Sequence, residues 1–377
     1  MNKKIGICTL FTGYNFGSAL QAYATKTVLK EMGYSPRIIK ISGSIIGGRD
    51  VRIKKTLCTL IRMLLYSKNK KRVLNSFTEN GKSNLNNQIV SEFDSFYKKT
   101  LKPYYISYKK LKKDAKSPEW YAFVCGSDQV WNSSSFYVDP FYYLDFAPNS
   151  KRIAYAPSFG RDYIPEYNKR KIKKYLDEIQ FLSVREKTGK IIIKNLIGKE
   201  AEVCLDPTLL LRKDDWNSFL GTKISPRENY ILCYFLNKPN KKARDFIHEL
   251  SNDSGLEEIF INKPFGDDVI YCGPEGFLNC VKNAEYIITD SFHGVAFSLI
   301  FNKKFFVFDR QYLTENQSTR IKSLLDIIGL PIVFEFSGKA DSVVFDYKRI
   351  NKTINDERKK SLNYLRKSLE GVLDENE

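Results

Sequence analysis

The sequence is poor in histidine and has no closely paired cysteines. Only two histidines, His248 and His293, occur in 377 residues, so few positions can perform acid or base chemistry with an imidazole. The seven cysteines are scattered and include no Cys-x-x-Cys pair, which argues against a structural metal site and favours a reducing compartment. We therefore expect no structural metal site.

Long hydrophobic runs are also missing. No uninterrupted apolar stretch is long enough to span a bilayer. The apolar run Ile5–Phe11 is too short for a signal peptide and leads into a loop without a cleavage-site pattern, so we expect a first β-strand there. These absences predict a cytoplasmic protein.

Acidic residues are too few to balance the basic ones. The chain has 61 Lys and Arg against 43 Asp and Glu, a formal net charge of +18 that attracts nucleic acid, anionic lipid or phosphorylated metabolites. The positive charge is dispersed along the chain and no nucleic-acid recognition module is present. We therefore expect no nucleic acid partner.

The alternation of apolar patterns indicates an α/β protein. Hydrophobic residues make up 42% of the chain, which argues against disorder, and the length exceeds that of one core. Alternating strand and helix patterns predict two Rossmann-like domains with parallel sheets and a cleft between them. The predicted strands are Lys4–Phe11, Ser35–Ile41, Ala122–Cys125, Arg152–Ala156, Phe181–Val184, Ala201–Leu205, Tyr230–Leu236, Glu258–Ile261, Tyr286–Thr289 and Lys304–Phe308. The predicted helices include Ser18–Met32, Tyr167–Glu178, Lys241–Ser254, Pro274–Asn283, Ser291–Phe301, Thr319–Ile328 and Lys352–Leu373.

The expected domain boundary follows Asp206, at the end of a predicted strand. We assign residues 1–206 to an N-terminal domain, 207–350 to a C-terminal domain and 351–377 to a helix that packs back on the N-terminal domain. Within the first domain, residues 48–75 have apolar side chains at helical spacing surrounded by Lys and Arg. This segment is either a basic amphipathic helix on an anionic membrane or a helix packed on its own domain.

His293 is notable for its position in the pattern. Tyr286–Thr289 indicates a buried strand and Val295–Ile300 a helix that Ser291 could cap, so His293 falls near a strand-to-helix turn. In an open α/β sheet such turns lie at the carboxyl edge, where ligands bind, and a helix start attracts anions. His293 is therefore a candidate acid or base, the alternative being a satisfied core histidine.

Further motifs follow the predicted strands of the first half. They are Tyr14-Asn15-Phe16-Gly17-Ser18, Gly126-Ser127-Asp128-Gln129-Val130-Trp131-Asn132, Ala154-Tyr155-Ala156-Pro157-Ser158-Phe159-Gly160, Val184-Arg185-Glu186-Lys187-Thr188-Gly189 and Leu205-Asp206-Pro207-Thr208-Leu209. With Thr289-Asp290-Ser291-Phe292-His293-Gly294, and in this order, they resemble the polysaccharide pyruvyl transferase family. The resemblance extends from about Ile5 to about Leu330.

The resemblance implies a GT-B-like fold without a metal or cofactor, and transfer of the enolpyruvyl carbons of phosphoenolpyruvate to a sugar of a capsule, exopolysaccharide or lipid-linked precursor. The usual product is a pyruvate ketal. Expected partners are phosphoenolpyruvate, a polyprenyl-linked sugar and an anionic surface at the inner membrane face, with the N-terminal domain on the acceptor side. Two alternatives stay open: a nucleotide-sugar glycosyltransferase of the same architecture, and a non-catalytic basic protein that binds a membrane surface or nucleic acid.

The expected donor site draws on both domains. Arg185 matches the arginine of the family's Val-Arg-Glu-like motif and is assigned to the donor, although a salt bridge with Glu186 is an alternative. Many members carry an arginine two positions before the histidine, where this chain has Ser291, so Arg310 or Arg320 is expected to compensate. The full set of expected donor residues is Arg185, Ser291, Phe292, Gly294, Arg310 and Arg320.

The expected acceptor site lies on loops of the N-terminal domain. Asp128 is the second catalytic candidate because its carboxylate could take a proton from a sugar hydroxyl; it could equally cap the next helix. Trp131 either stacks on a pyranose ring or fills the core. The expected acceptor residues are Asn15, Gly17, Ser127, Trp131 and Asn132.

Overall fold

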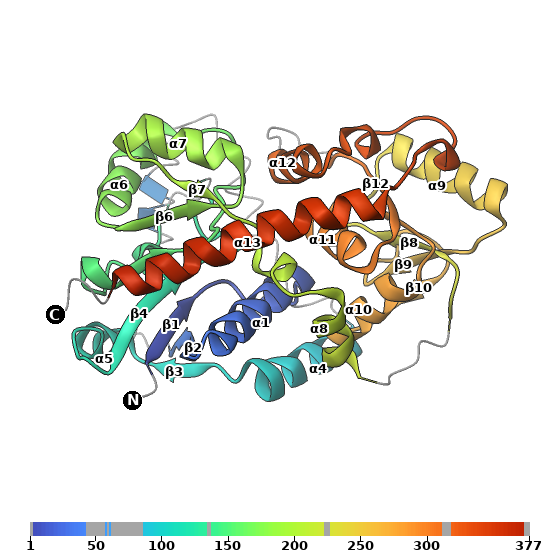
Figure 1. Ribbon diagram of the computed structural model, residues 1–377. Coiled ribbons are helices and arrows are strands. Elements are labelled where there is room, and N and C mark those ends of the chain that lie inside the picture. Colours follow the sequence, from blue (N-terminus) through green and yellow to red (C-terminus); the bar gives the residue numbers. More distant parts are fainter. Residues whose placement is uncertain are drawn as a thin grey trace.

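Two parallel β-sheets organise the protein (Figure 1). The computed structural model describes residues 3–42, 57–58, 60–61, 86–133, 137–221, 227–310 and 318–372. Within these ranges the first sheet has the order β3-β2-β1-β4-β5-β6-β7 and the second the order β10-β9-β8-β11-β12. The strands are β1 Lys4–Cys8, β2 Ser35–Ile41, β3 Tyr104–Ile106, β4 Trp120–Cys125, β5 Arg152–Ala154, β6 Phe181–Val184, β7 Glu202–Val203, β8 Ile231–Tyr234, β9 Glu258–Ile261, β10 Val269–Ile270, β11 Tyr286–Thr289 and β12 Lys304–Val307.

Helices flank both sheets. We call the part built on the first sheet the N-terminal lobe and the part built on the second the C-terminal lobe. The helices are α1 Phe16–Glu31, α4 Asn87–Phe96, α5 Tyr108–Asp114, α6 Glu166–Asp177, α7 Lys187–Ile197, α8 Lys213–Leu220, α9 Lys241–Ser254, α10 Pro274–Asn283, α11 Phe292–Phe301, α12 Thr319–Ile328 and α13 Tyr347–Gly371. A π-helical turn at Tyr97–Leu101 extends α4. This architecture confirms the predicted pair of Rossmann-like units with parallel sheets in a GT-B-like arrangement.

Every strand predicted from the sequence is present, and the register of neighbouring strands brings their carboxyl ends level. Cys8 pairs with Cys125, and Cys125 pairs with Ala154, so the loops after β1, β4 and β5 leave the sheet at one edge. The predictions miss the short strands β3 and β10 and the helices α4, α5, α7 and α8. The first helix begins at Phe16, two residues before the predicted start, because Asn15 is its N-cap.

The long helix α13 contacts both lobes. Near its start the Tyr347 hydroxyl donates to the carbonyl of Lys303, which precedes β12. Further along, the Tyr364 hydroxyl donates to the carbonyl of Ala154 in β5 at 3.1 Å. Figure 1 shows α13 crossing in front of both sheets. The helix starts at Tyr347, five residues before the start that the sequence predicts.

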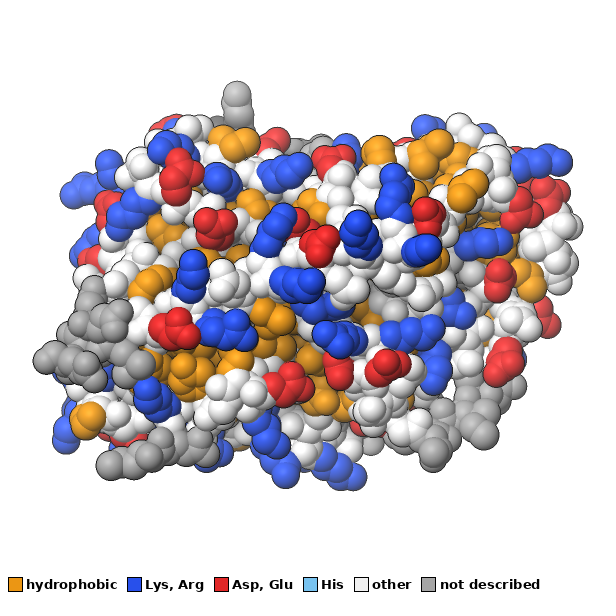
Figure 2. All heavy atoms as spheres, in the orientation of Figure 1, with side chains coloured by type: hydrophobic (Ala, Val, Ile, Leu, Met, Phe, Trp, Pro, Cys, Tyr) orange, Lys and Arg blue, Asp and Glu red, His pale blue; other side chains and the backbone are white. Residues whose placement is uncertain are grey.

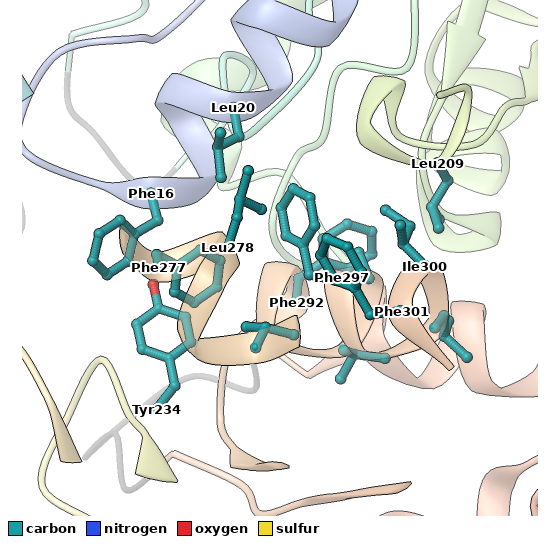
Figure 3. Packing of buried hydrophobic residues seen from close by; sticks show 14 of the residues in the cluster. Phe16, Leu20, Leu209, Tyr234, Phe277, Leu278, Phe292, Phe297, Ile300 and Phe301 are labelled. Atoms are coloured by element: carbon teal, nitrogen blue, oxygen red, sulfur yellow. The ribbon is translucent and has the colours of Figure 1, made fainter. Parts of the chain in front are cut away.

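Aromatic packing joins the two lobes. Phe16, at the start of α1, stacks on Phe277 of α10 with ring centroids 4.5 Å apart, and on Phe93 of α4 at 5.3 Å. Tyr234 of β8 closes the group with an edge contact to Phe16 at 5.6 Å (Figure 3). The buried apolar residues of the two lobes form one continuous core next to the carboxyl edges. Aromatic pairs such as these stabilise the contact between the lobes beyond what burial of their area alone provides.

The surface carries mixed charge. On the face crossed by α13, basic and acidic side chains are interspersed rather than separated by sign (Figure 2).

Across the described ranges, no helix combines the length and the apolar character needed to span a bilayer. The segment predicted as a basic amphipathic helix, residues 48–75, lies outside the described residues except for positions 57, 58, 60 and 61.

Candidate active site

The carboxyl edges of the two sheets face each other, and several buried polar side chains meet between them. The loops after β4, β5, β6 and β7 come from the N-terminal lobe, and the turns after β11 and β12 come from the C-terminal lobe. In parallel α/β sheets this edge is where ligands bind. The site is therefore built from the residues that leave these strands.

Asp206, which follows β7, is the centre of the cluster. Its Oδ2 atom accepts from Arg185 Nη1 at 2.5 Å and lies 2.9 Å from the Ser127 hydroxyl, while Oδ1 accepts from the amide and hydroxyl of Thr208 at 3.0 and 2.8 Å. Burial by itself would raise the pKa of Asp206, but His293, Arg185 and the Thr208 amide lower it far below the usual range. Asp206 is thus an ionised carboxylate that ties three strand exits together.

Arg185 leaves β6 and is held on three sides. Besides Asp206, its Nη2 atom lies 3.6 Å from Asp128 Oδ1, and its guanidinium packs on the Phe292 ring at 4.3 Å from the centroid. Burial would lower the pKa of Arg185, yet the carboxylates of Asp206, Asp128 and Glu186 keep it raised. Among the described residues, its Nε and Nη2 atoms have no hydrogen-bond partner, so both can donate to a ligand.

His293, the second residue of α11, reaches across to the N-terminal lobe. The residue is 5% exposed, and its Nε2 atom lies 3.7 Å from Asp206 Oδ2 without a hydrogen bond. On the other side of the ring, Nδ1 lies so close to Gly17 that a Cβ atom on that residue would sit 1.9 Å away. Gly17 was expected to let a ligand approach; in the structure it lets the imidazole of the other lobe approach.

Gly17→Ala should therefore separate the lobes or displace the imidazole. We expect any reaction rate that depends on His293 to fall by roughly a hundredfold, because a misplacement of about 1 Å at a reacting group can cost that much. Steady-state rates, with circular dichroism to check folding, measure the effect. Gly33→Ala is the matched control: Gly33 follows the end of α1 with φ of +88°, and a Cβ atom added there would meet no atom within 4 Å, so alanine adds only local strain. Equal activity of the two variants would contradict the assignment.

Asp128 joins the cluster after β4. Its Oδ2 atom accepts from the Ser18 hydroxyl at 2.6 Å, and its backbone has φ of +64°. Burial opposes ionisation, but Arg185, His293, Ser18 and Arg320 together lower the pKa of Asp128. No helix follows it in the described loop, so the carboxylate is not a helix cap. Asp128 is instead an ionised group beside His293 and Arg185.

Asn15 and Ser127, two of the residues expected at the acceptor site, form hydrogen bonds within the protein. Asn15 Oδ1 accepts from the Ser18 amide at 3.0 Å, which caps α1. The Ser127 hydroxyl is fully buried and lies 2.8 Å from the Ala156 carbonyl as well as next to Asp206. Both side chains therefore fix the loops around Asp128 through bonds within the protein.

Trp131 fills the core of the N-terminal lobe. It is 1% exposed, its indole N–H donates to the Tyr142 carbonyl at 2.9 Å, and its ring stacks on Tyr143 with an interplanar angle of 3°. Phe159 packs against it as well. The core role, one of the two alternatives from the sequence, is the one the structure supports. The Asn132 amide lies 2.8 Å from that of Gln129, in the same loop.

The turn before α11 packs tightly on β11. Ser291 occupies the N-cap position, but its side chain makes no capping bond, contrary to the expectation from the sequence; its amide donates to Thr289 Oγ1 at 3.0 Å. At Gly294 a Cβ would lie 2.4 Å from Thr289 Oγ1, so glycine permits the helix to approach the strand. Phe292 supplies the ring under Arg185. The turn thereby fixes His293 in place.

The structure distinguishes the two arginines that could compensate for Ser291. Arg310 donates to the Asp290 carbonyl from Nε and Nη2 at 3.2 and 3.0 Å and pairs with the Asp290 carboxylate, within the C-terminal lobe. Arg320, at the start of α12, is buried and reaches Gln129 of the N-terminal lobe when the amide oxygen faces the guanidinium. Burial, together with the charges of Arg185 and Arg310, lowers the pKa of Arg320 to about 9. Arg320 is therefore the arginine that lies with Arg185.

The sequence assigned no role to Asp206, although it is the centre of the site. The sequence did contain a signal, because Asp206 follows a predicted strand and precedes a proline, in a motif that the resemblance already included.

The alternative pairing of Arg185 with Glu186 is wrong for the described structure: Arg185 pairs with Asp206 and Asp128 instead. Alternation along the strand exit points the two side chains to different neighbours.

The space beside these groups is small. The cavity lined by Arg185, Asp206 and Phe292 has a volume of about 10 Å³, room for about one water molecule. In the described ranges, this cluster included, no group of three or more His, Cys, Asp or Glu side chains is arranged to hold a metal ion.

The chain is similar in sequence or structure to several known proteins. A family model described as polysaccharide pyruvyl transferase matches residues 15–312. Among solved structures, the chain is similar to UDP-GlcNAc 2-epimerase from Neisseria meningitidis bound to UDP-GlcNAc, with 10% identity over 99% of this chain and 100% of that one and a TM-score of 0.47. It is also similar to the glycosyltransferase SnogD from Streptomyces nogalater, with 9% identity over 99% and 98% of the two chains and a TM-score of 0.43. The search of curated proteins found no match.

Proposed function

The chain belongs to the polysaccharide pyruvyl transferase family, and we propose that it transfers the enolpyruvyl carbons of phosphoenolpyruvate to a sugar and forms a pyruvate ketal. The observation that carries this proposal is the convergence of His293 from one lobe and Arg185 from the other on Asp206. Phosphoenolpyruvate has a carboxylate and a phosphate, and guanidinium groups bind both kinds of oxyanion. Arg185 and Arg320 are buried and have atoms able to donate, which supports an anionic donor.

His293 acts as the general acid in this proposal. It protonates the methylene carbon of the donor, and positive charge develops on the neighbouring carbon. A first sugar hydroxyl adds to that carbon and gives its proton to Asp128, whose ionised state suits a base. The second hydroxyl displaces phosphate, which takes the proton from Asp128 as it leaves, and closes the ketal ring, while the proton of this hydroxyl returns to His293. Asp206 holds Arg185 by a hydrogen bond and faces the imidazole, so it keeps the guanidinium beside His293.

A thermal-shift titration tests the donor. Phosphoenolpyruvate should raise the melting temperature, since a ligand that binds only the folded state stabilises it, and a panel of nucleotide sugars should not. Arg185→Ala should abolish the shift, whereas Arg227→Ala, at an exposed arginine paired with Asp268, should keep it. Stabilisation by a nucleotide sugar alone would instead favour a glycosyltransferase. Phosphate release that depends on an added sugar acceptor then tests the transfer.

The acceptor in this proposal is attached to a polyprenyl carrier at the inner membrane face, where the protein binds peripherally. The basic segment 48–75 supports this, because Leu57, Leu60 and Ile61 are each about half exposed. Neutralising Lys54, Lys55, Lys70 and Lys71 together should release the protein from anionic vesicles, since each basic residue near such a surface contributes about 1 kcal/mol. Vesicle sedimentation measures the bound fraction. Unchanged binding would count against membrane association through this segment.

A further inference from the structure

Buried polar atoms without partners gather where α7 and α12 begin. Among the described residues, Glu186 Oε2 and Thr188 Oγ1 of the N-terminal lobe, and Arg320 Nε and Thr319 Oγ1 of the C-terminal lobe, make no hydrogen bond. The two helix starts touch, because the Lys187 amide donates to the Ser323 hydroxyl at 3.4 Å. Figure 1 shows the helices on the same side of α13, one from each lobe. Buried groups of this kind normally have partners, so the junction is a candidate binding site.

Glu186 is a carboxyl group that the reaction proposed above does not use. It is completely buried, and its Oε1 atom accepts both the Ser158 hydroxyl at 2.9 Å and the Phe159 amide at 3.0 Å. Burial raises the pKa of Glu186, although Arg185 and Arg320, the charged groups that face it, act in the opposite direction. Because Oε1 accepts both bonds, a proton on this carboxyl belongs on Oε2.

Arg320 approaches the same place from the other lobe. It is 5% exposed, and its terminal nitrogens contact the Gln129 amide, which packs against Gly160. The Gly160 amide donates to the Ser158 hydroxyl at 2.9 Å, and that hydroxyl in turn bonds Glu186. A short chain of contacts therefore links Arg320 to Glu186. The Nε–H of Arg320 is left as a buried donor.

An oxyanion with several acceptor oxygens matches this set of groups. A guanidinium N–H, two hydroxyls and a protonated carboxyl can all donate, and the starts of two helices add their positive dipole ends. A carboxylate would repel an anion, so the neutral form of Glu186 is the one that fits. Wherever Glu186 is ionised in the free protein, an anion that binds here must therefore take up a proton with it.

We propose that the junction of α7 and α12 binds the phosphate group of the donor, with Arg320 and the protonated carboxyl of Glu186 both donating hydrogen bonds to it. Thr188 and Thr319 flank the group. The assignment rests on the proposed function in naming a phosphorylated donor; the oxyanion site itself does not. It divides the site in two, with Arg185, Asp206 and His293 around the reacting carbons and Arg320 with Glu186 around the phosphate.

Calorimetric titration of the full chain with sulfate tests the oxyanion site, since sulfate does not titrate near neutral pH. Sulfate should bind with proton uptake, seen as a heat that depends on the ionisation enthalpy of the buffer. Arg320→Gln should weaken binding roughly ten- to a hundredfold, the effect of losing a hydrogen bond to a charged group. Arg227→Gln is the exposed control and should leave binding unchanged.

Glu186→Gln separates the role of the proton from that of the side chain. The amide can donate without a proton from solvent, so sulfate should still bind within about threefold, and proton uptake should disappear. His293→Gln should keep the uptake. Sulfate binding that is absent, or that is insensitive to Arg320→Gln, or proton uptake that persists in Glu186→Gln, would overturn the assignment.

The two proposals fail in different ways. If sulfate binding depends on Arg320 and Glu186 but phosphoenolpyruvate neither stabilises the protein nor reacts, the oxyanion site stands and the donor is wrong. If phosphoenolpyruvate reacts and both variants keep the wild-type KM for it, the donor stands and its phosphate binds elsewhere. Inorganic phosphate, the expected product, should compete with sulfate in the first titration.

Discussion

His293→Ala should keep the fold and lose turnover by a factor on the order of 10² to 10⁴, the usual contribution of a positioned general acid. The ring makes no hydrogen bond through Nε2 in the described structure, so its removal leaves no protein donor or acceptor newly unpaired there. The expected loss lies in kcat. Rates of phosphate release in the presence of a sugar acceptor measure it, and circular dichroism checks the fold.

The chain supplies its own control for this experiment. His248, the other histidine, lies on α9 with an exposed side chain beside Glu258. His248→Ala should have wild-type turnover, because its ring faces solvent outside the cluster around Asp206. A His293→Ala protein as active as His248→Ala would remove the imidazole from the reaction and leave the arginines as a binding site only.

Local pattern was sufficient to predict most of the fold. The run Tyr286–Thr289 is buried on both faces, as a continuous β-branched stretch predicts for a parallel strand. The missed strands are short and lie at sheet edges: β3 has three residues and β10 has two. Such strands form because a neighbouring strand offers hydrogen bonds, and that neighbour is a property of the tertiary structure.

Site residues could be predicted from the sequence where their position depends only on the strand that they follow. His293, Arg185 and Asp128 each follow a predicted strand, and all three meet in the structure. The role of Asp206 depends instead on donors from separate strand exits, Ser127 and Arg185, and on its position facing His293 of the opposite lobe. Likewise, only the tertiary contact of Arg310 with Asp290 shows that this arginine is engaged within its own lobe.

Asp206→Asn should have the largest combined effect on stability and activity. Asp206 is buried and pairs with Arg185, which is also buried, so the substitution leaves a guanidinium without its main partner. Breaking one side of a buried pair costs about 3–5 kcal/mol. Turnover should also fall, by roughly a hundredfold or more, because Arg185 loses the hydrogen bond that aligns it and His293 loses the negative charge that it faces. Chemical denaturation and steady-state kinetics measure the two effects.

Two controls separate this effect from the loss of any acidic residue. Asp268→Asn removes an exposed partner of Arg227 and should cost no more than about 1 kcal/mol. The double variant Asp206→Asn with Arg185→Met removes both charges, so it should be less destabilised than the sum of the two single variants. Additive losses would show that the pair is not coupled.

The dependence of stability on pH follows from the same carboxylate. The pKa of Asp206 is lower in the folded protein than in the unfolded chain, where it is about 4, so the unfolded state binds the proton more readily. The stabilisation from Asp206 is therefore complete at neutral pH and is lost as the pH falls below about 4. Asp206→Asn has no proton to bind at this position, and its free energy of unfolding should fall less steeply over the same acidic range. A variant with the acid dependence of the wild type would show that other carboxylates, Asp128 first among them, account for the acid sensitivity.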